Sequence, residues 1–133
     1  MSVYDPKQVT VVVGGRFITG FADGTFVNAE KLEDNFTEYV GAQGEVSTAE
    51  NGNKTGEITV TLASTSPSCS YLDGLASRKG ENAFIPSAVV DGNSGRTMGG
   101  SRTRVRKPAD AEFGNEVTER EYTIFVADYE VRG

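Results

Sequence analysis

The segment GEITVTLAS, residues 56–64, is the part of the sequence that most restricts the fold. Its aliphatic and polar side chains alternate, with Ile58, Val60 and Leu62 on one side of an extended chain and Glu57, Thr59 and Thr61 on the other. A period of two residues is typical of a β-strand with one buried and one solvated face. The segment therefore predicts a sheet that covers a core and keeps its other face polar.

The segment EVTEREYTIFVADYEV, residues 116–131, is predicted to form the longest strand. One face would carry Tyr122, Ile124 and Val126, and the other Thr123, Phe125, Ala127 and Tyr129. A strand that is apolar on both faces is covered either by its own domain or by a neighbouring subunit. Phe125 is therefore a candidate contact between subunits.

Turn signals separate further strands. Gly14 and Gly15 suit a tight hairpin turn between two short strands within residues 9–21, and ADGT at residues 22–25 predicts a second turn, leading into a third strand. Residues 33–44 are interpreted as extended. A strand within residues 82–93 is interrupted near Pro86, which indicates a sheet edge or a β-bulge.

The period changes in SPSCSYLDGLASRKG, which predicts one short helix at about residues 67–79. Ser66 can cap it, and Pro67 suits its first position. An apolar stripe is expected from Cys69, Leu72, Leu75 and Ala76, with Gly80 as the stop signal.

These patterns predict a mainly β protein, a small antiparallel β-barrel or sandwich with one short α-helix, in a single domain over residues 1–133. No run of about 18 apolar residues indicates a membrane span, and the start MSVYDPKQ lacks the pattern of a signal peptide. A lone cysteine, Cys69, excludes an internal disulfide. Folding in a reducing cytoplasm is expected.

The sequence does not carry the residues of a common active site. There is no histidine, and neither a dinucleotide fingerprint nor a P-loop motif is present. The stretch DGNSGRTMGG lacks the spaced acidic ligands of a calcium loop, so a flexible loop is expected there. Cys69 is interpreted as a core residue, because no imidazole is available to activate it. The chain is predicted not to be an enzyme and to need no cofactor or metal.

Charge is unevenly distributed along the chain. The formal net charge is −6, yet residues 96–107 hold five basic residues and no acid, which leaves 8 basic against 19 acidic residues elsewhere, or −11. An acidic body disfavours general binding of nucleic acid. Alternating arginines in this basic strip, Arg102, Arg104 and Arg106, would form one row that contacts acidic surface of a neighbouring subunit or of another protein around it. The alternative is a solvated loop without a partner.

The segment EVSTAENGNKTGEITVTL, residues 45–62, is predicted to form a long hairpin that turns at Asn51 and Gly52. Its first strand and tip are polar and offer little apolar area for a core. We therefore predict a subunit contact over residues 46–55 that stays mobile until assembly. Its named contact residues are Val46, Ser47, Thr48, Glu50, Asn51 and Lys54.

The hairpin NGNKTGEITVTLAS, followed by the helical SYLDGLA and a long terminal β-region, resembles the tail tube proteins of contractile-tailed bacteriophages. These are similar in fold to the inner-tube proteins of type VI secretion systems and R-type pyocins. The resemblance in element order covers about residues 9–131. The stretch 36–44 and the basic strip match no element of that family.

The resemblance implies a structural virion protein of the phage tail, assembled in the bacterial host cytoplasm. Hexameric rings would stack into a hollow inner tube, with the tail sheath, tape-measure and terminator or baseplate proteins as partners. Phage DNA would pass through without specific binding, because acidic and hydroxyl side chains in the lumen repel or do not hold its backbone. Glu57, Thr59 and Thr61 are the lumen candidates; the alternative is that they simply face solvent.

Two other classes of protein stay open. A monomeric β-sandwich binding module or a minor virion decoration protein would use the same strands to recognise a sugar or a capsid surface. An OB-like barrel that binds single-stranded nucleic acid fits the strand pattern, but the net charge disfavours it.

Overall fold

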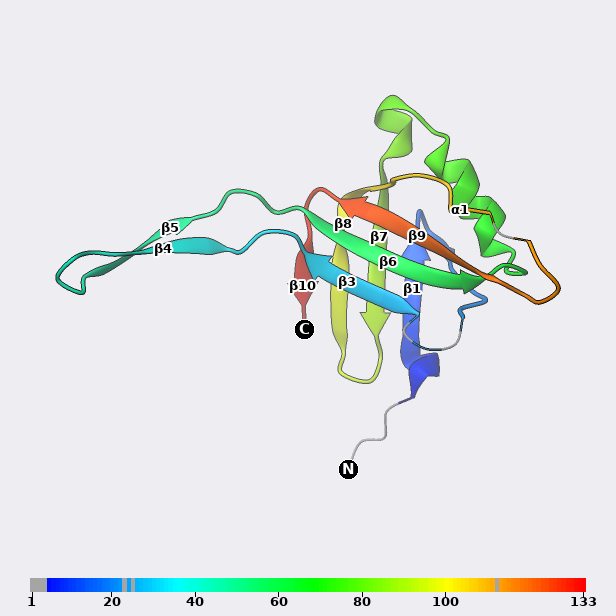
Figure 1. The fold of residues 1–133 in the computed structure, drawn as a ribbon, viewed down its shortest axis with the longest axis horizontal. Coiled ribbons are helices and arrows are strands. Elements are labelled where there is room, and N and C mark those ends of the chain that lie inside the picture. The colour runs from blue at the N-terminus through cyan, green and yellow to red at the C-terminus, as the bar shows by residue number, and fades with distance from the viewer. Residues whose placement is uncertain (1–4, 23, 25, 112) are drawn as a thin grey trace.

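The computed structural model describes residues 5–22, 24, 26–111 and 113–133 and consists mainly of antiparallel strands (Figure 1). The strands are β1 (Val9–Val13), β2 (Arg16–Phe17), β3 (Val27–Lys31), β4 (Phe36–Val40), β5 (Val46–Glu50), β6 (Gly56–Ala63), β7 (Ile85–Asp91), β8 (Arg96–Val105), β9 (Glu119–Val126) and β10 (Glu130–Arg132). The helix α1 covers Ser68–Ala76, and two 3₁₀ turns cover Pro6–Gln8 and Gly80–Ala83. In this part of the chain, no helix has the length and apolar character needed to cross a membrane.

Eight strands form one antiparallel sheet in the order β2-β1-β7-β8-β9-β6-β3, with β10 added beside β8. This sheet folds over itself, so that β3, β6 and β9 cross in front of β1, β7 and β8 (Figure 1). The arrangement confirms the expected antiparallel fold with one short helix. It places the core between the two crossed layers.

The core contains the residues that the alternation predicted. Side chains of both layers are fully buried, among them Val11, Val13, Ile58, Val60, Leu62, Tyr122, Ile124 and Val126. The strands β6 and β9 pair over eight residues, from Gly56 opposite Val126 to Ala63 opposite Glu119. The polar face of β6 and the Phe125 face of β9 therefore lie together on the outer side of this layer.

The strand β8 belongs to both layers because it bends at Gly99 and Gly100. Residues 96–100 pair with β7, and residues 97–99 also pair with β10 on the other side. Residues 103–105 pair with β9, while Thr103 still lies opposite Ile85 of β7. Gly99 has a φ of +147°, a conformation that suits glycine. A Cβ at Gly99 would collide with the Ser87 carbonyl oxygen, and one at Gly100 would collide with the Asp128 carboxylate. Only a strand without side chains at this point allows such close approach.

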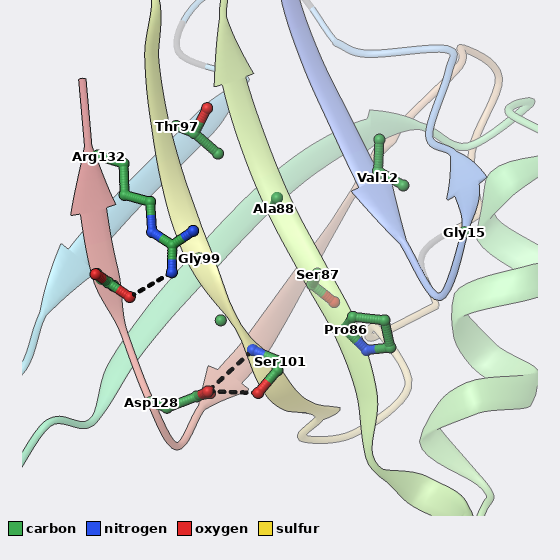
Figure 2. A pocket seen from close by; sticks show the side chains of 12 residues that line it. Val12, Gly15, Pro86, Ser87, Ala88, Thr97, Gly99, Ser101, Asp128 and Arg132 are labelled. Carbon is green, nitrogen blue, oxygen red and sulfur yellow. Dashed lines mark hydrogen bonds and ion pairs between the residues drawn. The ribbon is translucent and has the colours of Figure 1, made fainter.

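Asp128 holds the bend in place (Figure 2). Its carboxylate accepts hydrogen bonds from the Ser101 backbone N–H and hydroxyl, at 3.1 and 2.6 Å, and from the Arg102 backbone N–H at 3.0 Å. Partial burial raises the pKa of Asp128, but the bonds from Ser101 and Arg102 outweigh it and lower the pKa below the ordinary value. The ionised carboxylate therefore stabilises the bent strand.

The predicted terminal strand over residues 116–131 is wrong in its length. It breaks after Val126, because Ala127 donates its backbone N–H to the Arg102 carbonyl oxygen at 2.9 Å and Tyr129 donates to that of Lys54 at 2.8 Å. Tyr129 is buried instead of lying beside Phe125. The longest strand is β8, with ten residues.

The helix is shorter than the predicted 67–79 and is fixed to both layers by polar contacts. Pro67 lies at the N-cap and not at the first helical position, and the Oγ of Ser66, one residue earlier, accepts from the Ser68 N–H at 3.2 Å. The Tyr71 hydroxyl donates to the Val13 carbonyl oxygen at 2.7 Å, and the Tyr122 hydroxyl donates to Asp73 Oδ1 at 2.9 Å. Burial, aided by the bond to Asp73, raises the pKa of Tyr122, so the phenol stays protonated.

The two predicted turns and the predicted interruption near Pro86 have different outcomes. Gly14 and Gly15 do form the turn between β1 and β2, both with positive φ. Near Pro86 the pairing of β7 with β8 shifts register, which confirms the bulge and not the sheet edge, because β7 lies between β1 and β8. The turn predicted at residues 22–25 falls partly on residues 23 and 25, which lie outside the described residues.

The variant Gly99→Ala should lose roughly 2–4 kcal/mol in free energy of unfolding, because both backbone strain and the collision with Ser87 oppose the bend. Urea denaturation measures this loss. The control Gly114→Ala, where a Cβ meets nothing within 4 Å, should change stability by less than about 0.5 kcal/mol. Equal stability of both variants would contradict the role of the bend.

The variant Asp128→Ala should be less stable than the wild type by about 1–3 kcal/mol at pH 7, because it removes a charged acceptor of three hydrogen bonds. The folded-state pKa of Asp128 lies below its unfolded value of about 3.9. Its contribution is therefore present above pH 4 and disappears as the pH falls through the folded-state pKa. Denaturation at pH 7 and pH 3 should show the difference shrinking; a constant difference would exclude the carboxylate as its source.

Candidate assembly interface

A two-stranded arm projects from the body of the molecule (Figure 1). The arm, residues 33–53, contains β4 and β5, which pair only with each other, from Phe36 opposite Glu50 to Val40 opposite Val46. All ten residues of the two strands are exposed. An isolated two-stranded ribbon is marginally stable in water, so the arm lacks the support that a third strand or a core would provide.

The predicted hairpin turn at Asn51 and Gly52 is wrong. The arm turns ten residues earlier, in the sequence GAQG, where Gly41 donates its N–H to the Glu45 carbonyl oxygen at 2.7 Å and Gly44 has a φ of +88°. Asn51 instead lies at the base of the arm and donates its backbone N–H to the Asn35 carbonyl oxygen at 2.8 Å. Its side-chain Oδ1 accepts from the Asn53 N–H at 2.9 Å, which leads the chain toward β6.

The arm exposes four large apolar side chains, of which the sequence interpretation assigned only Val46 to a contact. Tyr39 is 71% exposed, Val46 67%, Val40 61% and Phe36 47%. Phe36, Val40 and Val46 share one face of the arm with Glu38, Thr48 and Glu50, because alternate residues and cross-strand partners point the same way. The three apolar residues of FTEYV, Phe36, Tyr39 and Val40, were the available signal.

Five of the six hairpin residues predicted for the contact lie on the arm: Val46, Ser47, Thr48, Glu50 and Asn51. The sixth, Lys54, follows directly after its base, and its carbonyl oxygen holds the Tyr129 N–H. The structure therefore brings these residues together on one projecting element. Their role in assembly stays a prediction.

The arginine row has the predicted geometry. Arg102, Arg104 and Arg106 alternate with the buried Thr103 and Val105. The three guanidinium groups have partners in their own chain. Arg102 lies 3.3 Å from Glu81, and Arg104 donates to the Arg78 carbonyl oxygen at 3.1 Å.

The third arginine links the row to the lumen candidates. Arg106 lies 2.6 Å from Glu57 and stacks on the Phe125 ring at 5.0 Å. Phe125 is thus half-buried on the outer face of the sheet, and Glu57 is an ion-paired carboxylate. Thr59 and Thr61 continue the same face and are also half-buried.

A separate groove of about 450 Å³ lies over β7, β8 and β10 (Figure 2). Its charged groups are bonded to one another or to the chain: Asp128 to Ser101, and Glu130 to Arg132 at 3.0 Å. The Arg132 guanidinium lowers the pKa of Glu130. The charged groups of the groove therefore already have partners within the chain and are not left free to bind a ligand. Across the described residues, no three acidic or thiol side chains gather as a metal site.

Comparison with known proteins agrees with the tail tube resemblance. A family model described as Bacteriophage PhiTE tail tube protein matches residues 1–121. The chain belongs to this tail tube family. It is therefore a structural protein of the phage tail, and the family is not one of enzymes, as the sequence predicted.

One relative supports the assignment, and one solved structure shares the fold. Structural protein ORF10 of Pseudomonas phage KPP10 is 32% identical over 133 residues, covering 92% of this chain and 77% of the relative. The sheath/tube terminator of an extracellular contractile injection system, PVC, has a TM-score of 0.64 at 12% identity, covering 100% of this chain and 99% of that one.

Two further solved structures have the same fold. The sheath-tube complex of that injection system gives a TM-score of 0.62 at 14% identity, covering 97% of this chain and 90% of that one. The tube-terminating cap of the anti-feeding prophage gives 0.60 at 15% identity, covering 99% and 94%. At these identities the likeness shows the fold alone, and it extends over nearly the whole length of each chain.

Backbone amides of β4 and β5 should exchange quickly with solvent in the unassembled tail tube protein, because the arm has no third strand to protect it. Amides of β6 and β9, at the centre of the sheet, serve as the internal control and should exchange slowly. Hydrogen exchange with mass spectrometry measures both. Protection of the arm equal to that of β6 in a verified monomer would contradict this expectation.

Proposed function

We propose that this chain, as a single tail-tube unit over residues 1–133, forms hexameric rings that stack into the inner tube of a contractile tail. The observation that carries the proposal is the projecting arm, which exposes Phe36, Tyr39, Val40 and Val46 and pairs with no third strand in the described part of the chain. Ordering a backbone costs on the order of 1–2 kcal/mol per residue. Contact with another subunit would offset that cost and cover the apolar side chains.

The arm also favours assembly over a monomeric binding module. A module or decoration protein presents a preformed site on a rigid surface, whereas here four exposed large apolar side chains, those of Phe36, Tyr39, Val40 and Val46, lie on an unsupported ribbon. Rings need a heterologous contact, in which one surface of each copy meets a different surface of the next. A projecting arm and a separate receiving surface satisfy this requirement.

The outer face of β3, β6 and β9 is the surface proposed for the lumen. In register with the lumen candidates Glu57, Thr59 and Thr61 lie further polar side chains, Asn28, Glu30, Glu121 and Thr123. Hydroxyl and carboxylate groups give DNA phosphates no attractive partner, so the genome would slide without specific binding. Arg106 lies at the border of this face, where Glu57 neutralises it.

The other expected partners belong to the same proposal. Assembly in the host cytoplasm would bring the tube together with sheath, tape-measure and terminator or baseplate proteins. The similar injection-system structures come from a sheath-tube complex and from tube terminators, which supports contacts of this kind for the present chain. Phe125 and the arginine row remain proposed contact residues at the edge of the lumen face.

Concentrated purified protein should form rings or tubes visible by negative-stain electron microscopy. Replacing residues 36–50 by two glycines should leave a folded protein that forms neither, because Asn35 and Asn51 are already joined by a 2.8 Å hydrogen bond and no core residue is removed. Circular dichroism checks the fold. A wild-type monomer at every concentration would refute the tube. A tube reconstruction in which Thr59 and Thr61 face outward would refute the proposed lumen face.

A further inference from the structure

The arm has an unusual charge. Residues 33–53 contain five acidic residues and no basic one: Glu33, Asp34, Glu38, Glu45 and Glu50. Among the described residues, none of these five carboxylates has an ion pair. Like charges on a thin ribbon repel one another, so the arm should favour a cationic surface when it docks.

A cationic surface of the required kind surrounds Phe84, between the second 3₁₀ turn and β7. The Phe84 patch consists of this half-buried ring and the side chains of Arg102 and Arg104, and Arg78 adjoins it because its carbonyl oxygen accepts from Arg104. The Arg102 guanidinium carbon lies 4.4 Å from the centre of the ring, and that of Arg104 lies 5.9 Å from it. Two positive charges thus share one aromatic ring.

The positive charge of the Phe84 patch is only partly compensated within the chain. The one carboxylate that pairs with it in the described part of the chain is Glu81, 3.3 Å from Arg102, and both side chains are well exposed, at 81% and 50%. Exposed pairs of this kind contribute little free energy. Arg104 donates to a carbonyl oxygen, that of Arg78, which carries no full charge. Further carboxylates would therefore bind here favourably.

The spacing of the charges on the two surfaces is similar. Arg102 and Arg104 are two residues apart on β8, which places them about 7 Å apart on one face. Glu38 and Glu50 are diagonal neighbours across the β4–β5 pair, because Glu50 is opposite Phe36, and such neighbours also lie about 7 Å apart. Both glutamates share the arm face that exposes Phe36, an apolar group suited to the Phe84 ring.

We propose that the acidic arm of one copy docks on the Phe84 patch of a neighbouring copy, with Glu38 and Glu50 binding Arg102 and Arg104. The inference rests on the proposed tube and names the receiving surface within it. The occupant is a second copy, because the arm projects away from the body of its own chain (Figure 1) and carries the complementary charge.

Charge reversal tests the pairing. Glu38→Arg with Glu50→Arg on the arm, or Arg102→Glu with Arg104→Glu on the patch, should each slow tube growth at least about tenfold, since like charges then meet. All four changes together should restore growth to within about threefold of the wild type. The matched control, Asp110→Arg with Glu116→Arg, reverses two exposed acids outside the arm and should leave growth unchanged. Circular dichroism verifies the fold of each variant.

Cross-linking between copies gives a second measurement. A chain with Glu38→Cys is mixed with a chain with Arg102→Cys and oxidised; a disulfide-linked dimer should form, whereas the pair Asn115→Cys and Arg102→Cys should give none. The native Cys69 is buried and does not interfere. Wild-type tubes with neither rescue by the fourfold reversal nor the cross-link would overturn this contact alone. A wild type that forms no rings or tubes would overturn the proposed function together with it.

Discussion

The bend of β8 at Gly99 and Gly100 is the constraint on which the rest of this fold depends. One strand passes from the layer of β7 to the layer of β9, and the Asp128 carboxylate holds it there through Ser101 and Arg102. Because the two layers share a strand, the sheet closes over its core without a second independent sheet. The same bend orients the second half of β8, so the arginine row follows directly from it.

The body and the arm of this chain differ in how their apolar side chains are covered. The body buries aliphatic side chains such as Val11, Ile58 and Leu62 between its crossed layers, whereas the arm leaves Tyr39 and Val46 about two-thirds exposed or more. A monomer gains nothing from extending such a ribbon, because few contacts offset the entropy of ordering it. The arm becomes favourable only when another surface covers it, and this is the physical link between its structure and a tube.

Local patterns in the sequence were sufficient for the core face of the body, but not for the arm or for contacts between residues distant in sequence. The alternation around Ile58 and Val60 predicted the core face, and Gly14 with Gly15 predicted a turn, because these features depend on neighbours in sequence. The Asn51-Gly52 turn was wrong because β5 pairs with β4 and not with β6, a choice that residue-by-residue propensity does not encode. The contact of Asp128 with the β8 bend joins residues 27 positions apart, and local sequence patterns did not predict it either.

Segregation of charge explains why the arm and the body need not attract each other before assembly. The basic residues near Phe84 lie on the body, the acids of residues 33–53 lie on the arm, and the extended β4–β5 pair keeps the two apart within one chain. At physiological ionic strength, screening limits their interaction to about 8 Å. An interaction of such short range acts only between surfaces already brought close, as in a growing ring stack. Charge then selects the register of subunits, while the apolar side chains of the arm contribute the larger part of the free energy of contact.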